Sequence, residues 1–425
     1  MTSSIATDPI TSVQCIFVTK NLLYSSLIPT NPILIPTKLR RFGLSEIINH
    51  VLNLEKKIPF DFIINDNVLT TSLQTYLKKY EISNENVLTL EFVESLTEPK
   101  LEKAMKSNDW IKCIKANNEF IATGSFDHRT RIYNHSGDLL HNIEFESVVQ
   151  SLCWLKDESG IASSVILNGN QSGIVECWKV KPDEMEKELV FFCQDAQGAI
   201  ECLDVNFDGT LFASASFDSS IHIYSTDKDD NTLDSTLDQS KRRKTGKIVK
   251  KKIASGTLKG HHASVSSLNF SKDQHSNTLF SVGWDHTVRE WDVNEESNKN
   301  TMNCENVILN ISQSPKTGLL ATGHTDNLVR LWDPRVKEGL VVKLKLKSHS
   351  GWSSCVSWVN AYNLVSGGYD GFLKVWDIRS TSPIYSIKTF DNDSDPKKIF
   401  GLDILDQRLY SGGEEGLLRT YFCTF

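Results

Sequence analysis

The sequence lacks any apolar run long enough to cross a bilayer, which takes about 20 residues. Residues 1–9 contain neither a basic leader nor an apolar core, so nothing there predicts a secretory signal. The nine cysteines are scattered, odd in number and never spaced as Cys-x-x-Cys, which disfavours both a disulfide framework and a zinc site. We therefore expect an intracellular protein with reduced thiols.

Catalytic signatures are also missing. The sequence has no Walker loop, no His-Glu-x-x-His and no Gly-x-Ser-x-Gly, and its isolated carboxylates fall in predicted turns. The net charge of −7 argues against a globally basic nucleic-acid binder. These absences indicate a binding platform without a cofactor, not an enzyme.

A repeated segment organises most of the chain. Its fullest copy, residues 367–379 (GGYDGFLKVWDIR), is a small-residue turn with an Asp, followed by alternating apolar residues that end in an aromatic. This pattern predicts two strands around a tight turn. Copies aligned on the turn residue recur every 41 to 67 residues, at Asp127, Ser172, Asp218, Asp285, Asp326, Asp370 and Glu415. Seven copies with a period near 44 predict seven four-stranded blades.

The copies resemble the WD40 repeat, through Trp291-Asp292, Trp332-Asp333, Trp376-Asp377 and Gly260-His261. The resemblance implies an all-β, seven-bladed WD40 β-propeller, which we assign to residues 109–425. It also implies a structural hydrogen-bond network within the blades, made by Asp127, Asp218, His261, Asp285, Asp326 and Asp370. Buried carboxylates and imidazoles need partners, so we expect Asp285 beside His261. Blades without a Gly-His pair are expected to depend more on apolar packing.

Residues 10–96 do not fit the repeat. Strands are expected at 13–19, 33–35, 60–64 and 87–93, a helix at 43–52 and a short helix at 72–80. This order resembles the ubiquitin-like β-grasp, an α+β fold. Because no terminal Gly-Gly follows, we expect a docking domain and not a modifier. Residues 97–108 are expected to form a linker, and a segment within roughly 94–106 should supply the missing fourth strand of the last blade.

The long spacing between Asp218 and Asp285 indicates an insertion of about 20 residues near 227–255. Its first part is acidic, and its second part carries the basic residues Lys241, Arg242, Arg243, Lys244, Lys250, Lys251 and Lys252. With few apolar residues, the insertion is expected to be disordered. The basic run is compatible with a nuclear-import signal, an RNA phosphate contact or a solvated loop.

Two consecutive W-D-x-R segments, residues 332–335 and 376–379, resemble those of receptors that bring substrates to cullin-RING ubiquitin ligases. A substrate receptor or adaptor of such a ligase is therefore the alternative function. The structural interpretation is that each Arg covers a blade edge and pairs locally.

The chain as a whole resembles a family of WD-repeat ribosome-assembly proteins that partner pescadillo and the block-of-proliferation protein. The segments that carry this resemblance are residues 39–50 (LRRFGLSEIINH), 59–64 (PFDFII), 376–383 (WDIRSTSP) and the basic insertion. The sister family, notchless, has a longer propeller, so seven repeats favour the first family. The resemblance implies a non-enzymatic factor for maturation of the large (60S) ribosomal subunit and its pre-rRNA processing, located in the nucleus, nucleolus and nucleoplasm.

The same resemblance implies the partners. The propeller is expected to bind the block-of-proliferation protein, in 66S pre-ribosomal particles that also contain pescadillo, with no membrane contact. The ubiquitin-like domain is expected to dock on midasin, an AAA ATPase. There Glu85 would complete the coordination of a divalent cation, expected to be Mg²⁺, in midasin's metal-ion-dependent adhesion site. This chain alone is expected to hold no metal. The family usually has Gly at the position of Glu81, which makes Glu81 the alternative ligand.

Overall fold

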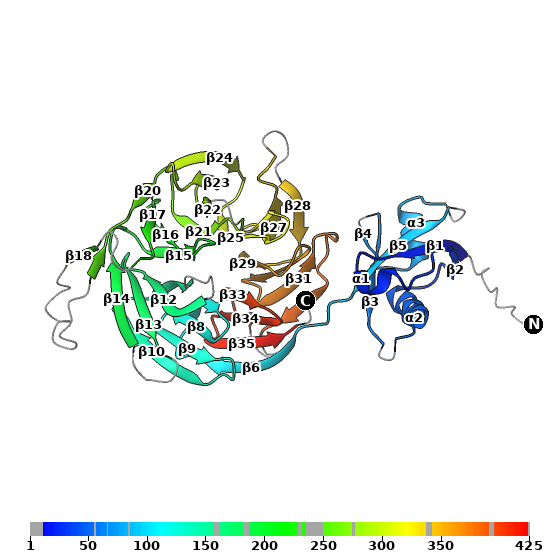
Figure 1. Ribbon diagram of the computed structural model, residues 1–425, viewed down its shortest axis with the longest axis horizontal. Helices are drawn as coiled ribbons and strands as arrows, with labels where there is room; N and C mark the ends of the chain where they lie inside the picture. The colour runs from blue at the N-terminus through cyan, green and yellow to red at the C-terminus, as the bar shows by residue number, and fades with distance from the viewer. Residues whose placement is uncertain are drawn as a thin grey trace, which may run out of the picture. The chain divides into compact units, whose positions relative to one another are not determined.

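The computed structural model describes residues 12–54, 57–65, 67–83, 86–156, 162–181, 187–227, 232–234, 250–273, 277–336, 342–390 and 395–423. The chain divides into two compact units, Met1–Thr97 and Glu98–Phe425 (Figure 1). No helix within those described ranges has both the length and the apolar character required to span a membrane. All nine cysteines lie in the described ranges and are free thiols. Burial raises the pKa of Cys113, Cys153 and Cys355 to about 12, which disfavours the reactive thiolate form of these side chains.

The first unit has the predicted β-grasp fold. Its sheet has the order β2-β1-β5-β3-β4, with β1 parallel to β5 and the other pairs antiparallel. The strands are β1 (Ser12–Val18), β2 (Ile33–Pro36), β3 (Phe60–Ile64), β4 (Asn67–Val68) and β5 (Leu88–Glu94). The helices are α1 (Leu22–Ser25), α2 (Arg41–Val51) and α3 (Leu73–Lys79). The sequence patterns gave no sign of α1 or β4, which are too short to show a periodicity.

The core of this unit follows from two periodicities. Alternate residues of β1 are buried, and the buried positions Leu44 and Ile48 lie one turn apart on α2. Both sets meet an aromatic cluster in which Phe60 and Phe92 contact edge to face at 5.3 Å.

The second unit is a propeller of seven sheets, as the repeat predicted. The first strands of consecutive blades lie side by side around the ring, and the seventh lies beside the first (Figure 1). Blade 1 contains β7 (Ile111–Ala116), β8 (Phe120–Ser125), β9 (Arg129–Asn134) and β10 (Leu139–Glu144). Blade 2 contains β11 (Val149–Lys156), β12 (Ala162–Asn170), β13 (Val175–Val180) and β14 (Lys187–Cys193). Blade 3 contains β15 (Ile200–Val205), β16 (Leu211–Ser216), β17 (Ile221–Ser225) and β20 (Gly256–Leu258).

Blades 4 to 6 contain three more sets of four strands. Blade 4 contains β21 (Val265–Phe270), β22 (Thr278–Gly283), β23 (Thr287–Asp292) and β24 (Ser297–Asn303). Blade 5 contains β25 (Ile308–Gln313), β26 (Leu320–His324), β27 (Leu328–Trp332) and β28 (Val342–Lys347). Blade 6 contains β29 (Ser353–Trp358), β30 (Asn363–Gly368), β31 (Phe372–Asp377) and β32 (Tyr385–Lys388).

Blade 7 takes strands from both ends of the propeller unit. Its order is β33 (Ile399–Leu405), β34 (Arg408–Gly413), β35 (Leu417–Phe422) and β6 (Lys100–Lys106). β6 pairs antiparallel with β35, with Lys106 opposite Leu417 and Lys100 opposite Phe422. The pairing covers the sheet edge that β35 would otherwise expose.

The turns between second and third strands share one backbone feature. The residue after each aligned turn position has a positive φ in all seven blades, from 64° at His128 to 78° at Gly173. Three of these residues are glycine, which adopts this conformation without strain. Four are not glycine: His128, Ser219, His286 and Asn327.

The insertion between blades 3 and 4 differs from expectation. Two short strands, β18 (Thr232–Asp234) and β19 (Lys250–Lys252), extend blade 2, because β19 pairs in parallel with β14. The ammonium of Lys252 is fully buried, donates to the carbonyl oxygens of Ser225 (2.6 Å) and Asp227, and lies 4.5 Å from the centre of the Phe191 ring. The expectation of a wholly disordered insertion is therefore wrong for these segments, since backbone pairing and the carbonyl oxygens compensate for the missing apolar residues. Residues 228–231 and 235–249 lie outside the described ranges.

Candidate interaction sites

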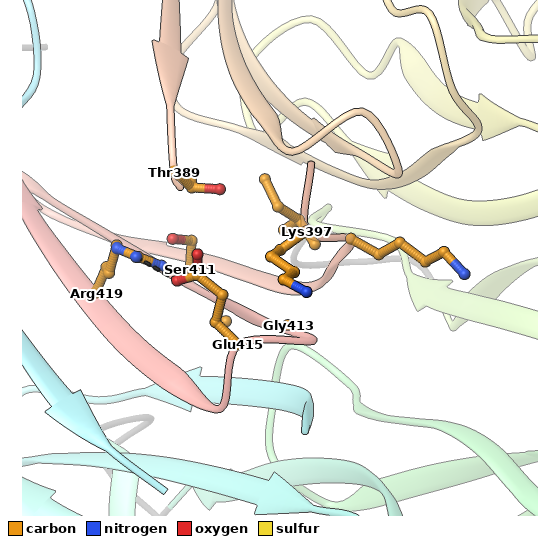
Figure 2. A pocket seen from close by; sticks show the side chains of 9 residues that line it. Thr389, Lys397, Ser411, Gly413, Glu415 and Arg419 are labelled. Carbon is orange, nitrogen blue, oxygen red and sulfur yellow. Dashed lines mark ion pairs between the residues drawn. The ribbon is translucent and has the colours of Figure 1, made fainter. Parts of the chain in front are cut away.

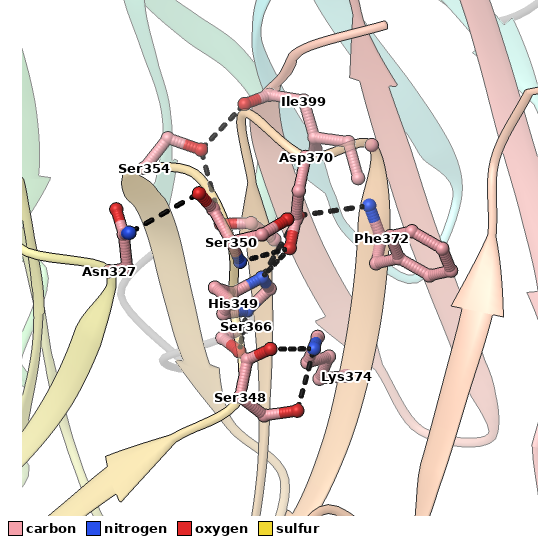
Figure 3. Close-up of polar contacts among 12 residues, drawn as sticks. Asn327, Ser348, His349, Ser350, Ser354, Ser366, Asp370, Phe372, Lys374 and Ile399 are labelled. Carbon is pink, nitrogen blue, oxygen red and sulfur yellow. Dashed lines mark hydrogen bonds and ion pairs between the residues drawn. The ribbon is translucent and has the colours of Figure 1, made fainter. Parts of the chain in front are cut away.

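Blades 4 and 6 each contain a buried relay of four side chains. In blade 6, Trp376 Nε1 donates to Ser366 Oγ (2.8 Å), which lies 2.7 Å from His349 Nε2. His349 Nδ1 lies 3.0 Å from the Asp370 carboxylate (Figure 3). A carboxylate can only accept, so Nδ1 carries the proton and Nε2 accepts from the serine hydroxyl. The relay ties strands β30 and β31 to the segment before β29.

The relay of blade 4 has the same geometry. Trp291 Nε1 donates to Ser281 Oγ (2.8 Å), and Ser281 Oγ lies 2.7 Å from His261 Nε2. His261 Nδ1 lies 2.8 Å from Asp285. Burial raises the pKa of Asp285, but the nearby His261 and the hydrogen bonds from His261, the His262 backbone N–H and Thr287 together outweigh burial and hold the pKa well below its usual range. The same balance, with His349, lowers the pKa of Asp370. The Asp285 and Asp370 carboxylates are both hydrogen-bonded within the blades, which assigns them a structural role.

Three of the other four turn acids are held by arginines on the third strand, not by histidine. Arg131 pairs with Asp127, Arg330 with Asp326 and Arg419 with Glu415, each four residues after the acid. Asp218 instead accepts from the Ser220 hydroxyl and from the backbone of Gln197 at 2.7 Å. Blades 1, 5 and 7, which lack a Gly-His pair, thus hold the turn acid with a partly buried ion pair in addition to the apolar packing that the sequence predicts.

Two signals in the sequence could have located these partners. His349 precedes the first residue of β29 by four positions, and His261 precedes β21 by the same interval, so Ser348-His349 is the equivalent of Gly260-His261. The position four residues after the turn acid is basic in six blades: Arg131, His222, Arg289, Arg330, Lys374 and Arg419. Blade 2, with Ser172 at the turn, has Glu176 there.

Blade 7 has a small pocket where blades 4 and 6 have an imidazole. Ser411 and Glu415 occupy the places of the relay serine and the turn acid, and they line the pocket with Thr389, Lys397 and Arg419 (Figure 2). The residue four positions before β33 is Asp395, which is exposed. No histidine therefore fills this place, and the Glu415–Arg419 ion pair holds the turn.

Aromatic side chains gather at the same turns. The rings of Trp352, Tyr369, Phe400, Trp110 and Phe126 form a continuous series over blades 6, 7 and 1, with centroid distances of 5.3 to 6.5 Å. A separate pair, Phe217 and Trp284, lies over blades 3 and 4 at 6.1 Å. Exposed aromatics of this kind are enriched in protein interfaces.

Two family models match the chain. The NLE (NUC135) domain matches residues 13–77, and the WD domain, G-beta repeat, matches 187–225, 253–292, 298–333 and 341–377. The ribosome biogenesis protein WDR12 homolog of Nematostella vectensis is 31% identical over 390 residues, which cover 88% of this chain and 91% of that protein. The ribosome biogenesis protein YTM1 of Eremothecium gossypii is 31% identical over 385 residues, 85% of each chain. This chain belongs to the WDR12/YTM1 family of ribosome biogenesis proteins.

Membership of the WDR12/YTM1 family makes the chain a WD-repeat ribosome biogenesis factor and not an enzyme. The W-D-x-R arginines agree with this. Arg335 Nε donates to Asp333 (2.8 Å), and Arg379 donates to Asp377 through Nε (2.9 Å) and Nη2 (2.6 Å) while lying 4.4 Å from the Tyr362 ring centre. Both side chains pair locally, which is the structural interpretation of the motif.

The predicted metal ligand of this WDR12/YTM1 chain, Glu85, lies outside the described residues. The alternative, Glu81, is exposed and ends α3. Its φ is 53°, and the next residue, Ile82, donates its backbone N–H to Leu77 O at 3.0 Å, which is a Schellman ending. That backbone conformation favours glycine, which is the residue that the family resemblance leads one to expect at this position. Across the described ranges, no cluster of three or more His, Cys, Asp or Glu side chains is placed to hold a metal ion.

The basic run of the insertion divides into two parts. Lys241, Arg242, Arg243 and Lys244 lie outside the described residues. Lys250, Lys251 and Lys252 form β19, and Lys252 is buried. Including Lys252 in an exposed targeting segment was therefore wrong, because its ammonium is bound within the propeller.

Proposed function

We propose that the chain is an assembly factor for the large (60S) ribosomal subunit and supports the processing of its pre-rRNA. The observation that carries this proposal is similarity to ribosome biogenesis proteins along both units, at 31% identity over 88% of the chain. Buried, mutually satisfied polar groups in the blades support a scaffold role.

The propeller is the module that joins the pre-ribosome in this proposal. It binds the block-of-proliferation protein within particles that also contain pescadillo. Seven closed blades give a rigid platform, and the exposed aromatic rings over their turns supply the large contact area that protein interfaces use.

The ubiquitin-like domain is the module through which midasin releases the factor. Glu85 supplies a carboxylate to a divalent cation, Mg²⁺, in midasin's adhesion site, where hard cations bind oxygen ligands. The family resemblance assigns the ligand to Glu85, and Glu81, whose side chain is exposed after the end of α3, is the alternative. The shorter Glu85→Asp should fail as Glu85→Ala and Glu85→Gln do, since both charge and reach matter.

Binding of the full chain to the isolated midasin adhesion-site domain, with magnesium or with chelator, tests this contact. Wild type should bind only with magnesium, and the three Glu85 variants should bind at least tenfold more weakly. Glu81→Gly is the matched control, and it should bind as wild type. Chelator-insensitive binding of Glu85→Ala equal to that of wild type would reject the assignment.

The site of action in this proposal is the nucleus, with the protein passing through nucleolus and nucleoplasm. The basic residues 241–244 serve as the import signal, and an RNA contact through them is the second use that the charge allows. Replacing those four residues with Ser should move the protein toward the cytoplasm, and unchanged nuclear accumulation would reject the targeting role.

Depletion of the protein tests the assembly function directly. Loss of the chain should reduce 60S subunits relative to 40S and cause large-subunit pre-rRNA to accumulate. A normal subunit ratio after complete depletion would contradict the proposal.

A further inference from the structure

The five aromatic rings over blades 6, 7 and 1 form the largest continuous ring cluster of the described part of the propeller. Trp352 and Trp110 lie at its two ends and are 45% and 41% exposed. Tyr369 and Phe400 connect them, with centroids 5.7 Å apart and half-buried rings. We call this set, Trp352, Tyr369, Phe400, Trp110 and Phe126, the seam patch, because it covers the place where the ring closes.

Two lysine side chains, those of Lys397 and Lys398, lie beside the seam patch. The ammonium of Lys398 lies 5.4 Å from the centre of the Tyr369 ring, and Lys397 lines the adjoining pocket (Figure 2). In the described part of the chain, no carboxylate lies within ion-pair distance of either ammonium. Arg419, on the other side of the pocket, pairs with Glu415. The two lysines therefore offer positive charge next to an exposed apolar surface in a protein whose net charge is −7.

The rim of the seam patch also carries carboxylates, which limits what can bind. Glu414 accepts from the backbone nitrogen of Lys398 at 3.1 Å, and Asp109 accepts from that of Trp110 at 2.8 Å. A continuous phosphate backbone would meet these carboxylates as well as the lysines. A peptide can place its carboxylates at the lysines alone, so the charges favour a protein segment over RNA.

We propose that the seam patch binds an extended segment of a partner protein in which an aromatic residue precedes a short acidic run. The aromatic side chain packs on Tyr369 and Phe400 between the two tryptophans. The acidic run lies at Lys397 and Lys398, where its carboxylates form ion pairs. The seam patch belongs to the exposed aromatic rings that the proposed function uses for protein contacts, so this inference rests on that function and names the kind of segment that a partner presents there.

The site lies where binding can also stabilise the propeller. Its rings come from the last two blades and the first, and blade 7 is completed by β6 from the start of the unit. A ligand that contacts both sides of the closure binds only the closed ring. By mass action it should raise the melting temperature of the protein.

The probe is a fluorescein-labelled ten-residue peptide in which two phenylalanines precede four consecutive glutamates, titrated into the full chain. We expect micromolar affinity that weakens as salt is raised. Trp352→Ala and the double variant Lys397→Ala, Lys398→Ala should each weaken binding at least tenfold. The peptide should raise the melting temperature of wild type but not that of Trp352→Ala.

Trp284→Ala is the matched control. Trp284 is 51% exposed and immediately precedes its turn acid, as Tyr369 does, but it lies over blades 3 and 4. It should leave peptide affinity within twofold of wild type. Equal losses in Trp284→Ala and Trp352→Ala would overturn the proposed location. No binding at 1 mM peptide would overturn the ligand class. So would a ten-nucleotide oligo-uridine RNA that binds more tightly and is weakened by the same variants.

Discussion

The carboxylate of Asp403 accepts a hydrogen bond of 2.7 Å from the backbone nitrogen of Ala116, across 287 residues of sequence. The bond joins the innermost strand of blade 7 to that of blade 1, so the ring is closed at its centre as well as at its rim by β6. Asp204 makes the equivalent bond from blade 3 to Phe270 in blade 4, also at 2.7 Å. The first and last blades are therefore joined by the same kind of aspartate-to-backbone hydrogen bond that joins blades 3 and 4.

Asp403→Ala should destabilise the propeller, because it leaves the partly buried Ala116 N–H without its acceptor. A buried unsatisfied group costs about 1–3 kcal/mol, so the free energy of unfolding should fall by up to this amount. Urea titration would show the loss as a lower midpoint. Asp403→Asn keeps an oxygen acceptor and should lose less. Identical midpoints for all three proteins would show that this bond contributes nothing to closure.

Removal of the closing strand should be more damaging. A protein that starts at Ser107 lacks β6 and exposes the edge of β35, so it should melt well below one that starts at Glu98, or aggregate. Both lack the N-terminal unit, which makes the second the control for the first. Equal melting temperatures would contradict the role assigned to β6.

The histidine relay of blade 6 should be a major source of stability. His349→Ala removes the imidazole partner of the buried Asp370 and Ser366 side chains, and the loss of a partner by a buried polar group costs about 1–3 kcal/mol. His262→Ala is the control, since His262 is exposed and contributes only its backbone N–H to the relay of blade 4. Thermal unfolding measures both, and a His349→Ala protein as stable as the control would refute the structural role.

The stability of the propeller should depend on pH through His324. Burial, aided by the nearby Arg330, lowers the pKa of His324 from 6.5 to about 3. Because the folded pKa lies below the unfolded one, the stabilisation is complete above pH 6.5 and is lost as the pH falls toward 3. The free energy of unfolding should fall by up to about 1.4 kcal/mol per pH unit in this window.

His324→Gln, which cannot be protonated there, should flatten this slope between pH 6.5 and 4.5, as urea titrations would measure. His222, whose pKa burial also lowers, contributes to the slope that remains. A slope unchanged by His324→Gln would show that other groups control the acid lability.

The anchor of the insertion should depend on one lysine. Lys252→Ala removes the bonds to Ser225 and Asp227 and leaves their carbonyl oxygens unpaired, so protease cleavage within the insertion should become faster. Lys251→Ala, one residue away on the same strand and partly exposed, is the control. Equal cleavage rates for both variants would contradict the anchoring role.

The repeat predicted the propeller because its turn and strand periodicities are local properties of the sequence. The spacing between Asp218 and Asp285 also located the insertion. It did not predict that β19 would join blade 2, because that pairing depends on backbone groups that are distant in sequence. Composition alone favoured disorder for the segment that contains Lys252.

The polar partners of the blades were only partly predictable. His261 stood out because Gly260 precedes it, whereas His349 follows a serine and was missed. The arginines paired with Asp127, Asp326 and Glu415 lie on predicted strands, where a charged residue is ordinarily expected to face solvent. Only the structure shows that these side chains point toward the turn acid. The aromatic rings of the seam patch come from three blades, so only the closed ring brings them together.

Purification of the tagged full-length protein from nuclear extract at mild salt tests the central claim most directly. The amount of large-subunit pre-rRNA, pescadillo and block-of-proliferation protein that accompanies it is the quantity to measure. The account predicts strong enrichment of all three over an untagged control, with cullin and RING subunits at background. Enrichment of ligase subunits without pre-rRNA would contradict the assembly function and favour the ubiquitin-ligase adaptor.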